Sequence, residues 1–300
     1  MNDTEREEAG ARVMSQLHVM RMGRGPDAPP LRPREGSPLS VPMATRLPVE
    51  EEITAAQAYA YGEVWGRPGL DMKTREHCVL AAVTALCHDD QIHIHTNNAL
   101  NLGLTPEEIH ETFMQAGVYA GITTWHNATN HARGVFLQRG IVQPSTILTP
   151  PGVRAMTLAE RRAAYQRVSA ALGVGRIGTG PDAPPLRPLP GGPSAVTART
   201  RLPIEDEISR LQAEYGYGEV WGRPGLSLRT RSFITLSVLQ VEHENDQLHI
   251  HVNNALNLGI TAEEVHECFM QVGVYGGLSG WHNAVNVARD VFIQRGILEA

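Results

Sequence analysis

The apolar positions of the chain repeat with the period of an amphipathic helix, and no Val/Ile/Thr-rich run alternates in the manner of a strand. Thr105 to Glu108 reads as a capping box with proline at the first helical position, and Gly103 is placed to end the preceding helix. The apolar residues of the first half predict helices at 4–20, 49–65, 73–88, 89–102, 105–119 and 123–139. The helix at 73–88 is apolar on all sides in its middle, which predicts a central position. The sequence therefore predicts an all-α fold.

The second half of the chain repeats the first. GEVWGRPGL occurs at 62–70 and again at 218–226, and HIHTNNALNLG at 93–103 matches HIHVNNALNLG at 249–259. WHNATNHAR, which begins at Trp125, matches WHNAVNVAR, which begins at Trp281. Two copies, each about one domain long, are not a solenoid array. We therefore expect two domains, 1–150 and 151–300, that pack as an intramolecular pseudo-dimer.

Each copy also contains a segment rich in proline and glycine, at 23–48 and at 173–203, after a helix that is predicted in the second copy at 157–172. Proline lacks the backbone N–H and restricts the residue before it, so these segments should be irregular or extended. Two interpretations stay open, an arm that wraps a surface and a linker.

Composition narrows the function classes. Lys and Arg number 26 against 32 Asp and Glu, a net charge of −6, and no basic stretch suggests a nucleic-acid partner. The three cysteines, at 78, 87 and 268, form neither a disulfide framework nor a CxxC motif. The longest apolar run, 78–87, is too short to span a bilayer, and the acidic N-terminus lacks the apolar region of a signal peptide. We expect a cytoplasmic protein with neither nucleic acid nor membrane as a partner.

Histidine is the main candidate for chemistry, because the chain has 13 and both copies keep the HxH pair. His95 shares a helix stripe with Ile92 and Ala99 and should face inward, whereas His93 aligns with Asn97 and Asn101 and should lie at a surface or interface. An inward histidine can also be a hydrogen-bonded core residue without a catalytic role. Two ligands of one metal on a helix favour i, i+4 spacing, so HxH does not indicate a metal site. No phosphate-binding loop follows a strand, and we expect neither a metal nor a cofactor.

The sequence from Tyr61 to Leu70, followed by Thr74-Arg75, His95, Gly103-Leu104-Thr105 and Glu108, resembles the carboxymuconolactone decarboxylase family. The second copy matches through Tyr217 to Leu226, Thr230-Arg231, His251 and Glu264. The resemblance covers most of each copy outside the proline-rich arms. It implies the all-helical fold of the alkylhydroperoxidase-D-like proteins, which form homo-oligomers that are often rings of three dimers. For a tandem chain this predicts a trimer of pseudo-dimers.

The peroxidase branch of that fold combines a CxxC motif with a glutamate 19 residues before a histidine. Glu76 and His95 keep that spacing, but the cysteine positions hold His88 and Gln91, and Glu244 and Gln247 in the second copy. Disulfide-based peroxide reduction is therefore excluded. In the decarboxylase branch a glutamate commonly stands four residues before the histidine, where this chain has Gln91 and Gln247. Ser232 replaces Glu76 in the second copy, which predicts two sites that are not equivalent.

The resemblance implies a cofactor-free acid/base lyase that decarboxylates a small anionic lactone of the γ-carboxymuconolactone type. His95 and His251 would be the acid/base residues, Glu76 would orient His95 or act as a base, and Arg75 and Arg231 would bind the substrate carboxylate. The expected pocket residues are Trp125, Trp281, Asn127, Asn283, Tyr61 and Tyr217, although the tyrosines, beside Trp65 and Trp221, could equally pack at an interface. Two alternatives remain, a lactone hydrolase or isomerase of specialised metabolism and a non-catalytic oligomeric scaffold.

Overall fold

The computed structural model describes residues 2–34, 36–37, 47–143, 156–192 and 202–299, and the predicted domain boundary at 150 lies outside them. The described residues are helical and contain no β-strand, so the all-α prediction is confirmed. The first copy comprises α1 (Asp3–Leu17), η3 (Pro48–Glu50), α2 (Glu51–Tyr59), η4 (Ala60–Trp65), α3 (Met72–Ala85), α4 (Asp89–Leu102), α5 (Pro106–Ala120) and α6 (Ile122–Gln138). The second comprises α7 (Leu158–Leu172), α8 (Glu205–Leu211), η7 (Gln212–Val220), α9 (Leu228–Val241), α10 (Asn245–Asn257), α11 (Ala262–Gly276) and α12 (Leu278–Gln294). No described helix is long and apolar enough to cross a membrane.

The helix ends follow the capping residues of the sequence. Thr105 accepts a hydrogen bond from the backbone N–H of Glu108, whose side chain bonds back to Thr105, as the capping box predicts. Gly103 ends α4 with a φ of 84°, a left-handed conformation that glycine adopts without strain. The helix expected at 49–65 is instead a 3₁₀ turn, a short α-helix and the π-helical segment η4. A π-helical segment, η7, recurs in the second copy, and such segments often occur at functional sites.

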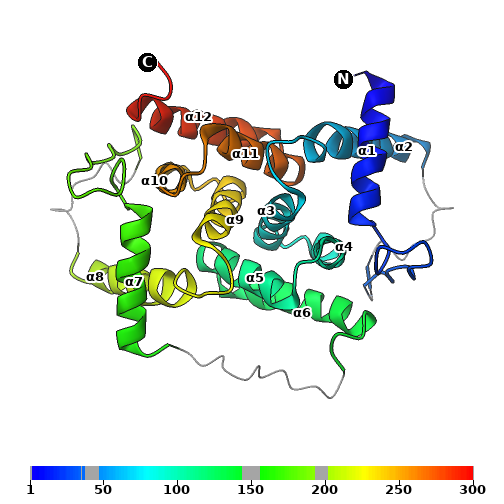
Figure 1. The fold of residues 1–300 in the computed structure, drawn as a ribbon, viewed down its shortest axis with the longest axis horizontal. Helices are drawn as coiled ribbons and strands as arrows, with labels where there is room; N and C mark the ends of the chain where they lie inside the picture. Colours follow the sequence, from blue (N-terminus) through cyan, green and yellow to red (C-terminus); the bar gives the residue numbers. More distant parts are fainter. Residues whose placement is uncertain (1, 35, 38–46, 144–155, 193–201, 300) are drawn as a thin grey trace.

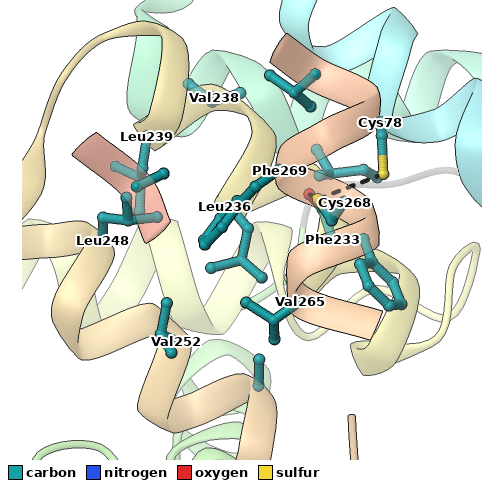
Figure 2. Packing of buried hydrophobic residues seen from close by; sticks show 14 of the residues in the cluster. Cys78, Phe233, Leu236, Val238, Leu239, Leu248, Val252, Val265, Cys268 and Phe269 are labelled. Atoms are coloured by element: carbon teal, nitrogen blue, oxygen red, sulfur yellow. Dashed lines mark hydrogen bonds between the residues drawn. The ribbon is translucent and has the colours of Figure 1, made fainter. Parts of the chain in front are cut away.

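The predicted central helix and its counterpart form the middle of the molecule. Figure 1 shows α3 and α9 side by side at the centre, and every α3 residue from Arg75 to Ala85 is buried. One apolar cluster includes residues of both copies, from α3, α9, α10, α11 and α12. In Figure 2 the side chains of Cys78 and Cys268, one from each copy, approach one another, with sulfur atoms 3.7 Å apart. The two copies therefore share one core and pack as an intramolecular pseudo-dimer.

Each copy also places its π-helical segment against the other copy. The segment η4 contacts α11, and η7 contacts α5. Within its own copy, η4 packs under α1, where a Cβ on Gly62 would overlap the backbone carbonyl of Arg6. The glycine therefore permits the close approach of these two helices. This arrangement brings side chains of η4 and α11 together, which matters for the site.

The described part of the first proline-rich segment wraps its own copy as an arm. The backbone N–H of Met22 bonds to the Pro29 carbonyl, and Leu31 is buried against the helices. Asn97 and Asn101 of α4 donate to the carbonyl of Arg21, just before this segment, and Nε2 of His93 lies 3.0 Å from the carbonyl oxygen of Arg32 within it. The face of α4 that the sequence assigned to a surface or interface is thus the contact face for the arm.

Candidate active site

His95 lies at the centre of a buried cluster in the first copy. Its side chain is 1% exposed, and its Nδ1 atom lies 2.8 Å from Oε1 of Glu76, which is fully buried on α3. With Glu76 ionised, the Nδ1–H group donates to the carboxylate and leaves Nε2 for chemistry. The spacing of these two residues thus produces a histidine–carboxylate pair, and His95 faces inward as its helix stripe predicted.

Aromatic side chains from both copies enclose the His95 ring. Trp65 of η4 stacks on it with an interplanar angle of 8° and 6.1 Å between ring centroids. Tyr275 of α11, which belongs to the second copy, meets the ring edge-on at 5.2 Å. The indole N–H of Trp65 donates to the Tyr275 hydroxyl over 3.2 Å, and Tyr61 lies beside Trp65. The first site is therefore composed of residues from both copies.

His251 occupies the equivalent place in the second copy. Trp221 stacks on its ring at 6.1 Å, and Tyr119 of the first copy meets the ring edge-on at 5.3 Å. The Trp221 indole donates to the Tyr119 hydroxyl over 3.0 Å, and that hydroxyl lies 3.3 Å from Nε2 of His251. Indole can only donate, so the Tyr119 hydroxyl oxygen accepts the bond from Trp221. The hydroxyl proton of Tyr119 can then be donated to Nε2 of His251.

A cavity of about 310 Å³ opens onto His251. Its size suits a small molecule, and its walls are largely aromatic and apolar. The residues that line it are Val118, Tyr119, Leu211, Gln212, Tyr215, Gly216, Tyr217, Trp221, Leu239, Glu242, Glu244, Gln247 and His251.

The two histidines differ in their partners, because Ser232 stands where the first copy has Glu76. Burial raises the pKa of Glu76, and the neighbouring His95 opposes that rise. Burial lowers the pKa of His251 to about 4, so this imidazole is neutral at pH 7. Among the described residues, Nδ1 of His251 and Oγ of Ser232 have no hydrogen-bond partner. The first site thus holds a histidine paired with a carboxylate, and the second a neutral histidine without one.

The tyrosines at both sites remain protonated over the whole physiological range. Burial raises the pKa of Tyr61 and of Tyr217 to about 12, and it raises the pKa of Tyr119 and of Tyr275 well above the ordinary value. Each hydroxyl is therefore a dependable hydrogen-bond donor. The sequence pointed to Tyr61 and Tyr217, which do lie at the sites, but it missed Tyr119 and Tyr275. Both follow Gly-Val in their copies, and this shared tripeptide was the available signal.

Arg75 and Arg231 lie in the interface between the copies. Arg75 is fully buried, and its guanidinium donates to the Glu267 carboxylate at 2.7 Å, to the Gln271 amide oxygen and to the Arg67 carbonyl. Arg231 donates in the same way to Glu111, Gln115 and Arg223. The Nη atoms of both arginines are thus engaged within the chain, whereas the buried Nε atom of each has no partner among the described residues.

The other expected pocket residues lie on α6 and α12. Asn127 and Asn283 are exposed. Trp125 and Trp281 are half-buried, and a Cβ on Gly117 would lie 2.6 Å from Cβ of Trp125. Neither these tryptophans nor these asparagines line the His251 cavity. The two histidines of the HxH pair have different partners, since His93 contacts the arm and His95 contacts Glu76. The described residues contain no group of three or more His, Cys, Asp or Glu placed to hold a metal ion.

Three curated proteins illustrate what the chain is similar to. It is 36% identical over 94 residues to 4-carboxymuconolactone decarboxylase of Acinetobacter baylyi, which covers 31% of this chain and 70% of that protein. It is 33% identical over 79 residues to nitrosuccinic acid decarboxylase of Metarhizium robertsii, or 26% of this chain and 55% of that protein. An uncharacterized 15.0 kDa protein of Paracoccus denitrificans is 30% identical over 83 residues, 27% of this chain and 62% of that protein.

Two of these relatives are named decarboxylases, which supports decarboxylation as an activity at the level of the family. The family model itself matches twice, at residues 51–133 and 206–290, and the two matches together cover more than half of the chain. Each match includes one π-helical segment and the histidine of one candidate site, His95 in the first match and His251 in the second. The chain therefore belongs to the carboxymuconolactone decarboxylase family, in a tandem form with two copies of the family domain.

Proposed function

We propose that the chain is a lyase that decarboxylates a small unsaturated carboxylated compound, such as a lactone of the γ-carboxymuconolactone type, at the His95 site. The observation that carries the proposal is the buried His95–Glu76 pair beneath Trp65 and Tyr275. The named decarboxylase relatives support it.

The reaction needs a place for the electrons that remain when CO2 leaves. In an unsaturated lactone they pass through the ring double bond to the carbonyl oxygen, and in a nitro acid they pass to the nitro group. The Tyr275 hydroxyl accepts from Trp65, so its own proton can be donated to the developing oxyanion. Because burial keeps the pKa of Tyr275 high, this donor persists at neutral pH.

The product carbon then needs a proton, since the carboxylate is replaced by C–H. Protonated His95 donates it from Nε2, while Nδ1–H stays bonded to Glu76. The carboxylate of Glu76 stabilises the imidazolium, which regains its proton from solvent after turnover. His251 lacks such a carboxylate, and we therefore assign the acid/base role of the pair to His95.

Both interface arginines are already bound to carboxylates, so in this proposal the substrate carboxylate meets aromatic rings instead of a cation. A carboxylate that is poorly solvated loses CO2 more readily than one in water.

The test is to incubate the chain with γ-carboxymuconolactone and, separately, with nitrosuccinate, while measuring CO2 release and identifying the products. We expect CO2 release that Glu76→Gln reduces strongly, with helicity by circular dichroism unchanged. Substitution of the exposed His126 by Gln is the matched control and should have no effect. Conversion of a lactone without loss of CO2 would instead support the isomerase or hydrolase alternative, which the same His95–Glu76 pair could serve by moving a proton.

A further inference from the structure

The two sites share their aromatic residues but differ in charge. Tyr215, Tyr217, Trp221 and Tyr119 line the His251 cavity, and the first copy has Tyr59, Tyr61, Trp65 and Tyr275 at the equivalent positions. Flat aromatic surfaces of this kind suit a planar ring. The His251 cavity thus suits a ring compound, and the charge that such a ring can carry depends on the remaining lining residues.

The remaining residues make the His251 cavity acidic. Glu242 and Glu244 line it, where the first copy has Leu86 and His88, and neither Lys nor Arg is among the lining residues. In the described part of the chain neither glutamate forms an ion pair with a basic side chain. Both glutamates are exposed. Partial burial and the neighbouring charge of Glu244 raise the pKa of Glu242, and the adjacent His243 opposes that rise.

The inner end of the cavity adds no positive charge. His251 is neutral at pH 7, and its Nδ1 atom is buried without a partner. A carboxylated ligand would therefore meet two carboxylates and no cation. An ammonium group would meet two carboxylates and the faces of electron-rich rings, an arrangement that favours organic cations.

We infer that the His251 cavity binds a planar ring compound that bears an amine, with the ring beside Trp221 and Tyr217 and the ammonium group beside Glu242 and Glu244. The inference concerns binding in the second copy and does not depend on the decarboxylation proposed for the first.

Three probes that share one ring test it, namely benzylamine, benzyl alcohol and benzoate, titrated into the full chain by calorimetry at pH 7. Benzylamine should bind about tenfold more tightly than benzyl alcohol, because two partly solvated ion pairs and ring contacts contribute modestly. Benzoate should bind this cavity most weakly of the three, and any benzoate held at the His95 site should be unaffected by changes in the His251 cavity.

The deciding variant replaces both glutamates with the residues of the first copy, Glu242→Leu with Glu244→His. It should weaken benzylamine binding about tenfold and leave benzyl alcohol binding unchanged, which also shows that the cavity is intact. The control Glu7→Leu with Glu8→His changes the net charge equally at exposed positions on α1 and should have no effect. The inference is overturned if benzylamine does not bind, if the cavity variant keeps full benzylamine affinity, or if that variant weakens benzoate binding as much as benzylamine binding.

Discussion

Replacement of Arg75 by methionine separates a role in the interface from a role in substrate binding. The guanidinium is fully buried and bonds to Glu267, to Gln271 and to the backbone of Arg67. Without this guanidinium, the ion pair that remains to Glu267 is the one with Arg67, whose Nε lies 2.7 Å from Oε1. The amide oxygen of Gln271 then loses the hydrogen bond from Arg75. Removal of one partner from a buried ion pair costs about 3–5 kcal/mol.

That cost is a large share of the roughly 5–15 kcal/mol that stabilises a typical domain. We expect Arg75→Met to lower the free energy of unfolding, measured with urea and circular dichroism, by about 3 kcal/mol or more. The double variant Arg75→Met/Glu267→Leu should recover much of the loss, because no buried charge is then left unpaired. The mirrored pair of Arg231 and Glu111 should behave in the same way.

The reasoning would be refuted by an Arg75→Met protein that loses less than about 1 kcal/mol of stability. A variant of normal stability whose KM for a carboxylated substrate rises sharply would instead restore the substrate-binding role that the sequence suggested for Arg75.

Three further predictions follow from single side chains. Ser232→Glu places a carboxylate where the first copy has one and should raise the pKa of His251 from about 4, as followed by NMR titration; an unchanged pKa would mean that the two groups do not meet. Gly69→Ala should lower the free energy of unfolding in urea by about 1–3 kcal/mol, because its Cβ would lie 2.5 Å from Cγ of Glu267, and a neutral effect would contradict that close packing. Burial lowers the pKa of His77 to about 4. Between pH 6.5 and 4 this histidine is therefore protonated in the unfolded chain and neutral in the folded chain, so the free energy of unfolding falls as the pH drops through this range. His77→Phe, the residue of the second copy, should lessen that fall by about 3 kcal/mol in urea titrations, and an unaltered fall would refute the assignment.

The helical fold was predictable because its signals are local. Apolar stripes, the Thr105 capping box and Gly103 each depend on neighbouring residues, and the ends they indicate agree with the structure to within a few residues. The inward orientation of His95 followed from spacing along its helix, and its pairing with Glu76 was implied by the family resemblance. Sequence therefore predicted the parts of the site that lie within one copy.

The parts of the site that lie between the copies could not be predicted in this way. Tyr275 reaches His95 from the other copy, and no pattern within one repeat reveals that contact. The role of the repeated GRPGL motif was hidden for the same reason, since its residues Arg67 and Gly69 contact Glu267 across the interface. Residues that two copies share can preserve their mutual contact as well as their chemistry.

The central claim is that His95 carries proton transfer in decarboxylation, and a comparison of the two buried histidines tests it most directly. His95→Gln and His251→Gln remove equivalent imidazoles, and only the first has a carboxylate partner. With γ-carboxymuconolactone as substrate, His95→Gln should reduce the rate of CO2 release by about 100-fold or more, and His251→Gln should leave most of it. Full CO2 release by a folded His95→Gln protein would contradict the claim.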